Sequence, residues 1–480
     1  MPIRFYDTLA RSAVDFDPRD AGKASMYACG LTVYNFAHIG NVRTLVWYDQ
    51  IRRYLTYRGF DVTYVMNYTD VDDKIIERAQ VEGITPEEVA TKYAEAFEAD
   101  MEALGAEPPT ILVKATDHIE DMVEGIARLI EKDAAYEADG DVYFAVDKFP
   151  GYGKLSNRSL DDMRAGERIE PSEKKRHPLD FALWKSAKEG EPAWPSPWAP
   201  GRPGWHIECS IMSTKHLGMG FDIHGGATDL IFPHHENEIA QAEALHEGDE
   251  PFARHWLHAG LVQMEDEKMS KSLGNVVLVR DVLERYSGAE TRYWILTSSY
   301  RSQAVFTSAA LEDAKQAYER LANFLAVAGH LLGDDMPSSP TEPRRPVESD
   351  LSHDEEPFLA RFVAAMDDDF NSAGALAVLH DLVRSGNKVI EDLQRGNDDS
   401  RKPLIGHVDN FLEMAWVLNL PFEVDSASTE LTGDLIDFLL QLRDQARDEK
   451  AFERADAIRA KLQELGMAIE DTPTGPRWRI

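Results

Sequence analysis

Near the start of the chain, short apolar runs alternate with one long amphipathic stretch. Residues 25–29 and 61–68 have the apolar and aromatic content of buried strands, and residues 40–58 have the spacing of a helix. A strand, a helix and a second strand in this order predict a parallel sheet with a right-handed crossover. Ligands bind beyond the carboxyl ends of such strands. We therefore expect a binding site near Cys29 and His38.

The next signals along the chain are helix starts, followed by a stretch without a regular period. A capping box at Thr85 predicts a helix to about residue 104, and Thr116 predicts the start of another helix. Residues 151–203 are irregular. We interpret residues 115–203 as an insertion that interrupts the sheet domain.

Helical spacing dominates the second half of the chain. Residues 307–420 predict a mainly α-helical bundle, interrupted at residues 333–357 by a linker rich in Pro, Ser and acidic residues. A small final unit occupies residues 421–480. The fold class expected from these patterns is α/β, with a Rossmann-like parallel-sheet domain first and helical units after it.

Length and cysteine content narrow the class of protein. A chain of 480 residues exceeds one ordinary domain and predicts about three or four. Two cysteines are too few for a disulfide framework and indicate a reducing cytosol, so we expect a cytoplasmic protein. No apolar run approaches the roughly 20 residues that span a bilayer, and the N-terminus lacks a secretory pattern. We expect no membrane partner.

The charge is strongly acidic. The formal net charge is −34, from 85 acidic and 51 basic side chains. Phosphate binding requires Lys and Arg, so the total charge argues against a nucleic-acid partner unless basic residues cluster locally. An acidic surface poor in lysine also stays soluble in concentrated salt, which screens its self-repulsion. We take the charge as an indication of environment rather than of function.

A group of metal-binding residue types lies between residues 204 and 238. His234 and Glu238 are four apart and share a face if they lie on a helix. Cys209 precedes them, and Cys29 is distant in sequence. Two thiolates, an imidazole and a carboxylate make an ordinary set of zinc ligands. The same pattern is equally compatible with a protein that has no metal site here. The two cysteines would then be small buried hydrophobic residues, and His234 and Glu238 would lie on a solvated helix face. These residues alone favour neither interpretation.

Two further stretches resemble the signature motifs of class I aminoacyl-tRNA synthetases. They are residues 38–41 (His-Ile-Gly-Asn) at a helix start and residues 268–272 (Lys-Met-Ser-Lys-Ser) downstream. A helix N-terminus attracts phosphate, and Gly40 allows close backbone approach. Two lysines would offset charge as pyrophosphate leaves. The first motif departs from the family at Asn41, where a second His is usual, and we expect activity to survive this change.

Within that class, the chain resembles cysteinyl-tRNA synthetases. The resemblance rests on the sequence around Cys29, residues 204–209, residues 221–226 and residues 232–238, and it runs collinearly from residue 5 to residue 478. It implies that one zinc ion per chain binds to Cys29, Cys209, His234 and Glu238. It also implies that ATP, with Mg²⁺, activates L-cysteine as cysteinyl-adenylate, and that the cysteinyl group passes to tRNA(Cys).

The resemblance assigns further residues to expected roles. The catalytic residues would be His38, Asn41, Lys268 and Lys271, with Gly40 and Ser270 completing the ATP site. The weaker candidates for the amino-acid pocket are Thr69, Trp205 and Asp229, and those for reading the anticodon are Arg447, Phe452, Asp456 and Asp471. Phe452 stands where the family typically has Trp, and it could instead be a core residue. His206, His224 and His235 would either line the pocket floor or simply pack.

The expected domain boundaries follow from the resemblance and the patterns together. They are 1–114 and 204–250 for the two halves of the catalytic domain, 115–203 for the connective insertion, 251–306 for the region bearing the Lys-Met-Ser-Lys-Ser motif, 307–420 for the helical bundle and 421–480 for the anticodon-binding unit. We expect a monomer.

Two other functions remain open from the sequence. Ligases that join activated cysteine to a small amine, as in mycothiol synthesis, share this catalytic half, although such a ligase would have no reason to carry the region after about residue 358 in this form. An inactive zinc-containing paralogue with a binding role is the other alternative, against which the intact Lys268 and Lys271 argue. If zinc keeps one ligand position open for a substrate thiolate, cysteine would be distinguished from serine without an editing domain.

Overall fold

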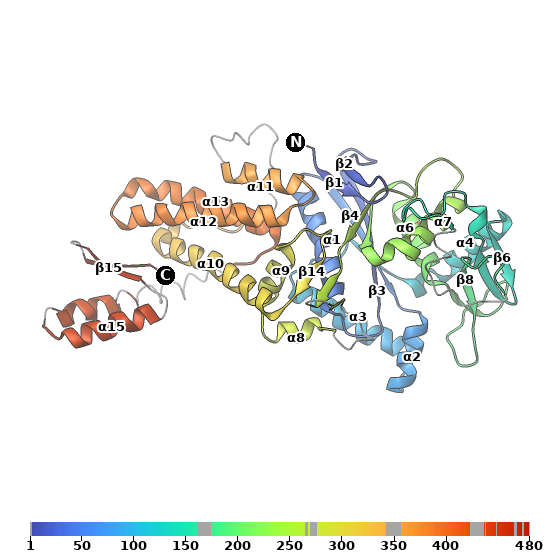
Figure 1. Cartoon of the computed structure of the whole chain (residues 1–480), viewed down its shortest axis with the longest axis horizontal. Helices are drawn as coiled ribbons and strands as arrows, with labels where there is room; N and C mark the ends of the chain where they lie inside the picture. Colours follow the sequence, from blue (N-terminus) through green and yellow to red (C-terminus); the bar gives the residue numbers. More distant parts are fainter. Residues whose placement is uncertain are drawn as a thin grey trace. The chain divides into compact units, whose positions relative to one another are not determined.

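The computed structural model divides into two compact units, coloured along the chain in Figure 1. Residues 1–311 with 364–373 form the first unit, and residues 312–363 with 374–480 form the second. The described residues are 2–160, 174–264, 267–268, 276–341, 357–422, 436, 438–447, 449–464, 468–472 and 475–479.

A five-stranded parallel sheet forms the centre of the first unit. Its strand order is β11-β10-β3-β4-β5, and the strands are β3 (Lys23–Thr32), β4 (Asp61–Thr69), β5 (Ile111–Lys114), β10 (Phe221–Ala227) and β11 (Ala253–Ala259). The predicted α/β fold with a parallel sheet is confirmed. The chain proceeds from β3 towards β5 and later from β10 towards β11, so the order reverses between β3 and β10. In open sheets of this kind, ligands bind at that reversal.

The helices of this unit pack on the sheet or on the elements beside it. Helix α1 contacts β3, β4 and β10, helix α6 contacts β3 and β4, and α7 packs on α6. Their bounds are α1 (Ile39–Tyr57), α2 (Asp73–Glu82), α3 (Pro86–Ala103), α4 (Ile119–Glu131), α6 (Trp205–Leu217), α7 (Glu236–Leu245), α8 (Val279–Leu283) and α9 (Gly288–Leu296). The predicted capping box at Thr85 is present at the start of α3.

The predicted insertion contains a second sheet, shown in cyan to green in Figure 1. It is antiparallel in the order β6-β7-β8-β9, with β6 (Ala135–Ala138), β7 (Asp141–Phe144), β8 (Phe181–Ser186) and β9 (Gly201–Pro203). The expectation of an irregular stretch from residue 151 to 203 is therefore wrong at β8 and β9, which are too short to show a period. Thr116 does not begin α4. It lies in the short 3-10 turn Ala115–His118, and its Oγ1 donates to Asp70 Oδ2 at 2.5 Å.

Small sheets complete the first unit. Strands β1 (Arg4–Asp7) and β2 (Ser12–Asp15) form a hairpin, and β12 (Val262–Met264) pairs with β13 (Glu267–Lys268) and with β14 (Ala304–Phe306).

The second unit is mainly helical. Its long helices are α10 (Ser308–Leu332), α11 (Pro357–Asp367), α12 (Ser372–Gln394) and α13 (Arg401–Leu418). The first residues of α10 and α12 and the last residues of α11 belong to the first unit's residue ranges. Phe324 of α10 packs against Phe411 of α13 and faces Gly386 of α12, so these three helices are in contact. This agrees with the predicted helical bundle.

The last part of the second unit contains a helix at residues 438–447, helix α15 (Phe452–Glu464) and a hairpin of β15 (Ala468–Thr472) and β16 (Gly475–Arg479). Its core consists of Ile436, Leu440, Leu462 and Ile469. Among the residues described across both units, no helix is both long and apolar enough to cross a membrane.

Candidate active site and metal centre

A cavity of about 320 Å³ opens at the reversal of strand order between β3 and β10. It reaches from Cys29 at the end of β3 to His38 and Asn41 at the start of α1, and Trp205 and Asp229 also line it. Residues that lie far apart in the sequence therefore border one cavity. The other lining residues are Gly30, Leu31, Thr32, Tyr34, Asn35, Phe36, Ala37, Gly40, Thr44, Leu45, Lys74, Ala227, Leu230, Leu261 and Val262.

His38 and Asn41 cap helix α1 reciprocally. The Nδ1 atom of His38 accepts a hydrogen bond from the backbone N–H of Asn41 at 3.2 Å, and Asn41 Oδ1 accepts from the backbone N–H of His38 at 3.3 Å. Because Nδ1 acts as an acceptor, a neutral His38 carries its hydrogen on Nε2. The ring then offers a donor beside the positive end of the helix dipole, an arrangement that suits a phosphate.

Gly40 lies tightly between His38 and β12. A Cβ atom at this position would lie 3.1 Å from His38 Nδ1 and 3.8 Å from Val262 Cβ. Any side chain here would press on the His38 ring, so glycine keeps the ring in its capping position.

The described segments on either side of the second predicted motif lie next to this helix start. After the motif, the backbone N–H of Val279 donates to Ala37 O at 3.1 Å, and the N–H of Ile39 donates to Val277 O at 3.0 Å. Before the motif, Val262 lies in β12. The backbone of Lys268, the motif's first residue, lies in β13 and pairs with Gln263 of β12. Ser270 and Lys271 lie outside the described residues.

The four predicted zinc ligands converge from separate elements. Cys29 Sγ lies 3.6 Å from Cys209 Sγ and 3.4 Å from Glu238 Oε1, and His234 Nε2 lies 3.0 Å from the same carboxylate oxygen. All four side chains are buried, and their ligand atoms lie within 4.8 Å of one another. The α6 helix supplies Cys209, while the turn Ile231–His235 and α7 place His234 and Glu238 one helical turn apart.

The electrostatics of this cluster prepare it for a cation. Burial alone would raise the pKa of Glu238, but hydrogen bonds and charge from His224 and His234 hold that pKa well below its ordinary value. Burial also opposes ionisation of Cys209, yet hydrogen bonds from Cys29 and His234 lower its pKa to about 6. Ionised sulfur and carboxylate are the forms that bind metal, so this donor set fits a zinc ion.

Cys29 differs from Cys209. Burial, together with the neighbouring Cys209 and Glu238, raises the pKa of Cys29 well above its ordinary value. The surroundings therefore oppose ionisation of Cys29 and favour that of Cys209. The nearby charge of a divalent cation would oppose this effect and favour ionisation of both sulfurs.

The three histidines left open by the sequence all lie on the floor of the cluster. His206 Nδ1 lies 2.8 Å from His234 Nδ1, and His224 Nε2 lies 2.8 Å from Glu238 Oε2. His235 Nε2 lies 3.9 Å from the other oxygen of Glu238. These histidines are therefore joined to the predicted ligands rather than packed elsewhere.

Of the amino-acid pocket candidates, Trp205 and Asp229 border the cavity, whereas Thr69 is not among its lining residues but pairs with one of them, Thr32. Trp205 is 38% exposed and contacts His234 with ring centroids 4.2 Å apart and ring planes tilted by 32°. Thr69 is buried, and its Oγ1 donates to Glu208 Oε2 at 2.7 Å. Burial, followed by the charge of Cys209, raises the pKa of Glu208 well above its ordinary value.

Sequence reasoning missed Glu208 and Asn67. Asn67 Oδ1 accepts the backbone N–H of Gly30 at 3.0 Å and lies 3.8 Å from Cys209 Sγ. A Cβ on Gly30 would lie 1.8 Å from Asn67 O, so glycine is required where the two strands meet beside Cys29. A buried polar residue inside an apolar strand was the available signal for Asn67.

The predicted anticodon residues lie at the end of the second unit. Phe452, the first residue of α15, is 60% exposed and so is not a core residue. Arg447 and Asp456 are exposed as well, and the backbone of Asp471 lies in β15. The exposed ring leaves Phe452 available for stacking.

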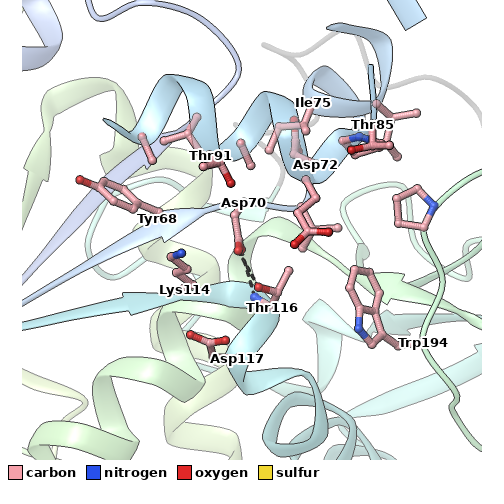
Figure 2. A pocket seen from close by; sticks show the side chains of 18 residues that line it. Tyr68, Asp70, Asp72, Ile75, Thr85, Thr91, Lys114, Thr116, Asp117 and Trp194 are labelled. Carbon is pink, nitrogen blue, oxygen red and sulfur yellow. Dashed lines mark hydrogen bonds between the residues drawn. The ribbon is translucent and has the colours of Figure 1, made fainter. Parts of the chain in front are cut away.

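A larger cavity of about 510 Å³ lies beside the carboxyl end of β4 (Figure 2). Asp70, which is hydrogen bonded to Thr116, lines it together with Asp72, Lys114 and Trp194. None of the described residues that line it belongs to the predicted site.

Comparison with known protein families accounts for most of the chain. A model described as "tRNA synthetases class I (C) catalytic domain" matches residues 15–316. A "DALR domain" model matches residues 361–423, and a "Cysteinyl-tRNA ligase anticodon binding domain" model matches residues 433–479.

Full-length relatives and solved structures agree with these models. A cysteine–tRNA ligase of Carboxydothermus hydrogenoformans is 46% identical over 477 residues, which cover 99% of this chain and 100% of the relative. One from Geobacter metallireducens is 46% identical over 491 residues, with 100% of both covered. In fold alone, the chain is similar to Mycobacterium tuberculosis methionyl-tRNA synthetase in complex with methionyl-adenylate, with a TM-score of 0.60 at 14% identity over 87% of this chain and 94% of that one.

Proposed function

The chain belongs to the family of cysteine–tRNA ligases, class I aminoacyl-tRNA synthetases, and on this premise we propose how its site works. Members of this family use ATP and Mg²⁺ to join cysteine to tRNA. We propose that the reaction passes through cysteinyl-adenylate, and that a zinc ion held by Cys29, Cys209, His234 and Glu238 selects cysteine over serine. The relation to full-length cysteine–tRNA ligases and the anticodon-binding model do not favour the small-amine ligase.

The observation that carries this proposal is the single cavity that borders both Cys29 and the N-terminus of α1. A cysteine with its sulfur at the metal cluster would direct its carboxylate towards His38 and Asn41. That placement brings the two reacting groups together and so supplies much of the catalysis by positioning.

The reaction then needs only positioning and charge stabilisation. A carboxylate oxygen of cysteine attacks the α-phosphorus of ATP, the bond to the bridging oxygen breaks, and pyrophosphate leaves with Mg²⁺. His38 Nε2–H and the first turn of α1 would donate to the phosphate oxygens. Lys268 and Lys271 would offset the charge on pyrophosphate. A terminal hydroxyl of tRNA next attacks the cysteinyl carbonyl carbon and passes its proton to a phosphate oxygen of the departing AMP, while the bond between that carbon and the phosphate oxygen breaks.

The amino-acid side of the site is formed by the chain's own polar groups. Asp229, exposed at the cavity rim, would hold the substrate ammonium, and the Trp205 ring would cover the bound side chain. A bound zinc ion would act as a Lewis acid, which binds a thiolate more readily than a neutral hydroxyl. A pocket that only fitted cysteine would discriminate by about 1–3 kcal/mol.

X-ray absorption at the zinc edge, with and without cysteine, tests the proposal. We expect cysteine to add one sulfur to the zinc shell and serine to add none. Cys209→Ser should lower both zinc content and the preference for cysteine in ATP–pyrophosphate exchange, while His246→Ala at the distal end of α7 should change neither. A zinc shell that gains no sulfur from cysteine would exclude the selection mechanism.

The tRNA side is assigned to the C-terminal unit. Arg447, Phe452, Asp456 and Asp471 would read anticodon bases by stacking and hydrogen bonding, as unpaired RNA bases are read. The domain boundaries expected from the sequence and the monomeric state stay predictions.

A further inference from the structure

His234 and His235 are adjacent in sequence and are supported in the same way. The Nδ1 atom of His234 lies 2.8 Å from a ring nitrogen of His206, and the Nδ1 atom of His235 lies 2.8 Å from His258 Nε2. Each then directs Nε2 towards Glu238 Oε1, at 3.0 Å from His234 and 3.9 Å from His235. Metal-binding histidines are usually held through the other ring nitrogen in this manner. The site described above uses only one of the two.

The nitrogen of His235 that faces Glu238 has no hydrogen-bond partner. His235 Nε2 and His224 Nδ1 are both buried without a partner among the described residues, and both rings are 0% exposed. Buried polar atoms are nearly always paired with protein, water or an ion. The orphaned Nε2 therefore points to a ligand.

The backbone makes room for His235 at this position. A Cβ on Gly226 would lie 2.7 Å from His235 Cε1 and 3.0 Å from its Nε2. Glycine in β10 therefore lets the ring approach with Nε2 turned to the cluster.

Hydrogen bonds on the far side of the His235 ring allow its Nε2 atom to be a metal ligand. Thr8 Oγ1 lies 2.8 Å from His258 Nδ1, and His258 Nε2 meets His235 Nδ1. If His258 donates from Nδ1 to Thr8, its Nε2 accepts a hydrogen from His235 Nδ1. His235 Nε2 then presents a lone pair towards Glu238.

We propose that the floor of the site holds a second metal position, formed by Cys29, His224, His235 and Glu238. Their ligand atoms lie within 4.8 Å of one another, and all four residues are buried. The position shares Cys29 and Glu238 with the zinc position proposed above, so the two are alternatives for one ion. The ligand class is a borderline divalent cation such as Zn²⁺ or Co²⁺, which accepts sulfur, nitrogen and oxygen donors.

The two positions differ in their sulfur ligands. An ion that moves to the second position gives up Cys209 and His234 and so changes from two thiolate ligands to one.

Cobalt titration of metal-free protein distinguishes the two positions, because the charge-transfer absorption of bound Co²⁺ depends on how many thiolates bind it. Cys209→Ala removes a ligand of the first position only. We expect this variant to bind one Co²⁺ per chain with a one-thiolate spectrum, and we expect a second change, His235→Ala, to weaken that binding by about 10-fold or more. In the otherwise native chain, His235→Ala should shift cobalt affinity less than about 2-fold, which separates a ligand role from a general loss of structure.

Several results would overturn the second position. One is a Cys209→Ala protein with a native thermal midpoint that binds no Co²⁺, and another is an equal affinity in the Cys209→Ala and Cys209→Ala/His235→Ala proteins. If Cys209→Ala fails to fold, His234→Ala replaces it, since His234 also belongs only to the first position. The proposed function is tested separately. If it is wrong, cysteine adds no sulfur to the zinc shell of the wild-type protein, whether or not these variants bind Co²⁺.

Discussion

His206 and His234 meet through their Nδ1 atoms, which lie 2.8 Å apart. Only one of the two nitrogens can carry the shared hydrogen. Burial lowers the pKa of His206 well below its ordinary value, whereas Glu238 and Cys209 overcome burial and raise the pKa of His234 to about 10. His206 is thus the acceptor, and it leaves Nε2 of His234 directed at the cluster.

This relationship predicts a selective effect of His206→Ala on zinc affinity. Without its acceptor, His234 loses its fixed orientation, and we expect zinc to bind about 10- to 100-fold more weakly. Chelator competition measures this, with His246→Ala as the matched control. A His206→Ala protein that binds zinc as tightly as the control would contradict it.

Two substitutions at Asn41 separate capping from phosphate binding. Asn41→Ala removes the acceptor for the His38 N–H and should cost about 0.5–2 kcal/mol of stability. Asn41→Asp keeps the acceptor, so its thermal midpoint should stay near that of wild type while its negative charge raises the KM for ATP. Thermal melts and ATP–pyrophosphate exchange distinguish the two. The argument fails if Asn41→Asp leaves the KM for ATP unchanged.

Glu208 should make the protein lose stability as pH rises. Burial raises its folded pKa above the unfolded value of about 4.3, so the folded state retains a proton that the unfolded state releases. The resulting loss in the free energy of unfolding is absent below about pH 4 and grows as pH rises towards the folded pKa. Glu208→Gln removes the titration and keeps a partner for Thr69. Urea unfolding of both proteins at several pH values between about 5 and 8 should show that the difference between their free energies of unfolding increases with pH. A constant difference would refute the assignment.

The exposed ring of Phe452 predicts a loss in tRNA charging alone. One lost base stack costs about 1–3 kcal/mol, so Phe452→Ala should lower kcat/KM for tRNA by roughly 5- to 150-fold. ATP–pyrophosphate exchange with cysteine should remain unchanged. Phe452→Trp is the matched control and should preserve charging. Equal charging by the Ala and Trp variants would show that Phe452 does not contribute to tRNA binding.

The net charge of −34 predicts a dependence on salt. Screening of self-repulsion should raise the thermal midpoint between about 0.1 and 2 M KCl. Salt also weakens phosphate contacts, so tRNA binding should rely on stacking and shape. A midpoint that stays flat or falls over this range would show that the acidic surface does not limit stability.

Local sequence was enough to predict the elements that form from neighbouring residues. The apolar run at residues 25–29 lies inside β3, the amphipathic stretch at 40–58 is α1 to within a residue or two, and the capping box at Thr85 opens α3. These features depend on periodicity and on cap hydrogen bonds within a few residues. The strands β8 and β9 were missed because their partners are distant and they are too short to alternate visibly.

The site itself depends on contacts across the sequence. Motifs named Cys29, Cys209, His234 and Glu238, but only the pairing of β3 with β10 and the packing of α6 on β3 and β4 bring two sulfurs separated by 180 residues to 3.6 Å. The roles of His206 and His235 were undecidable from sequence, because an imidazole is defined by what each of its two nitrogens meets. The fold places both nitrogens of each ring, and no local pattern records that placement.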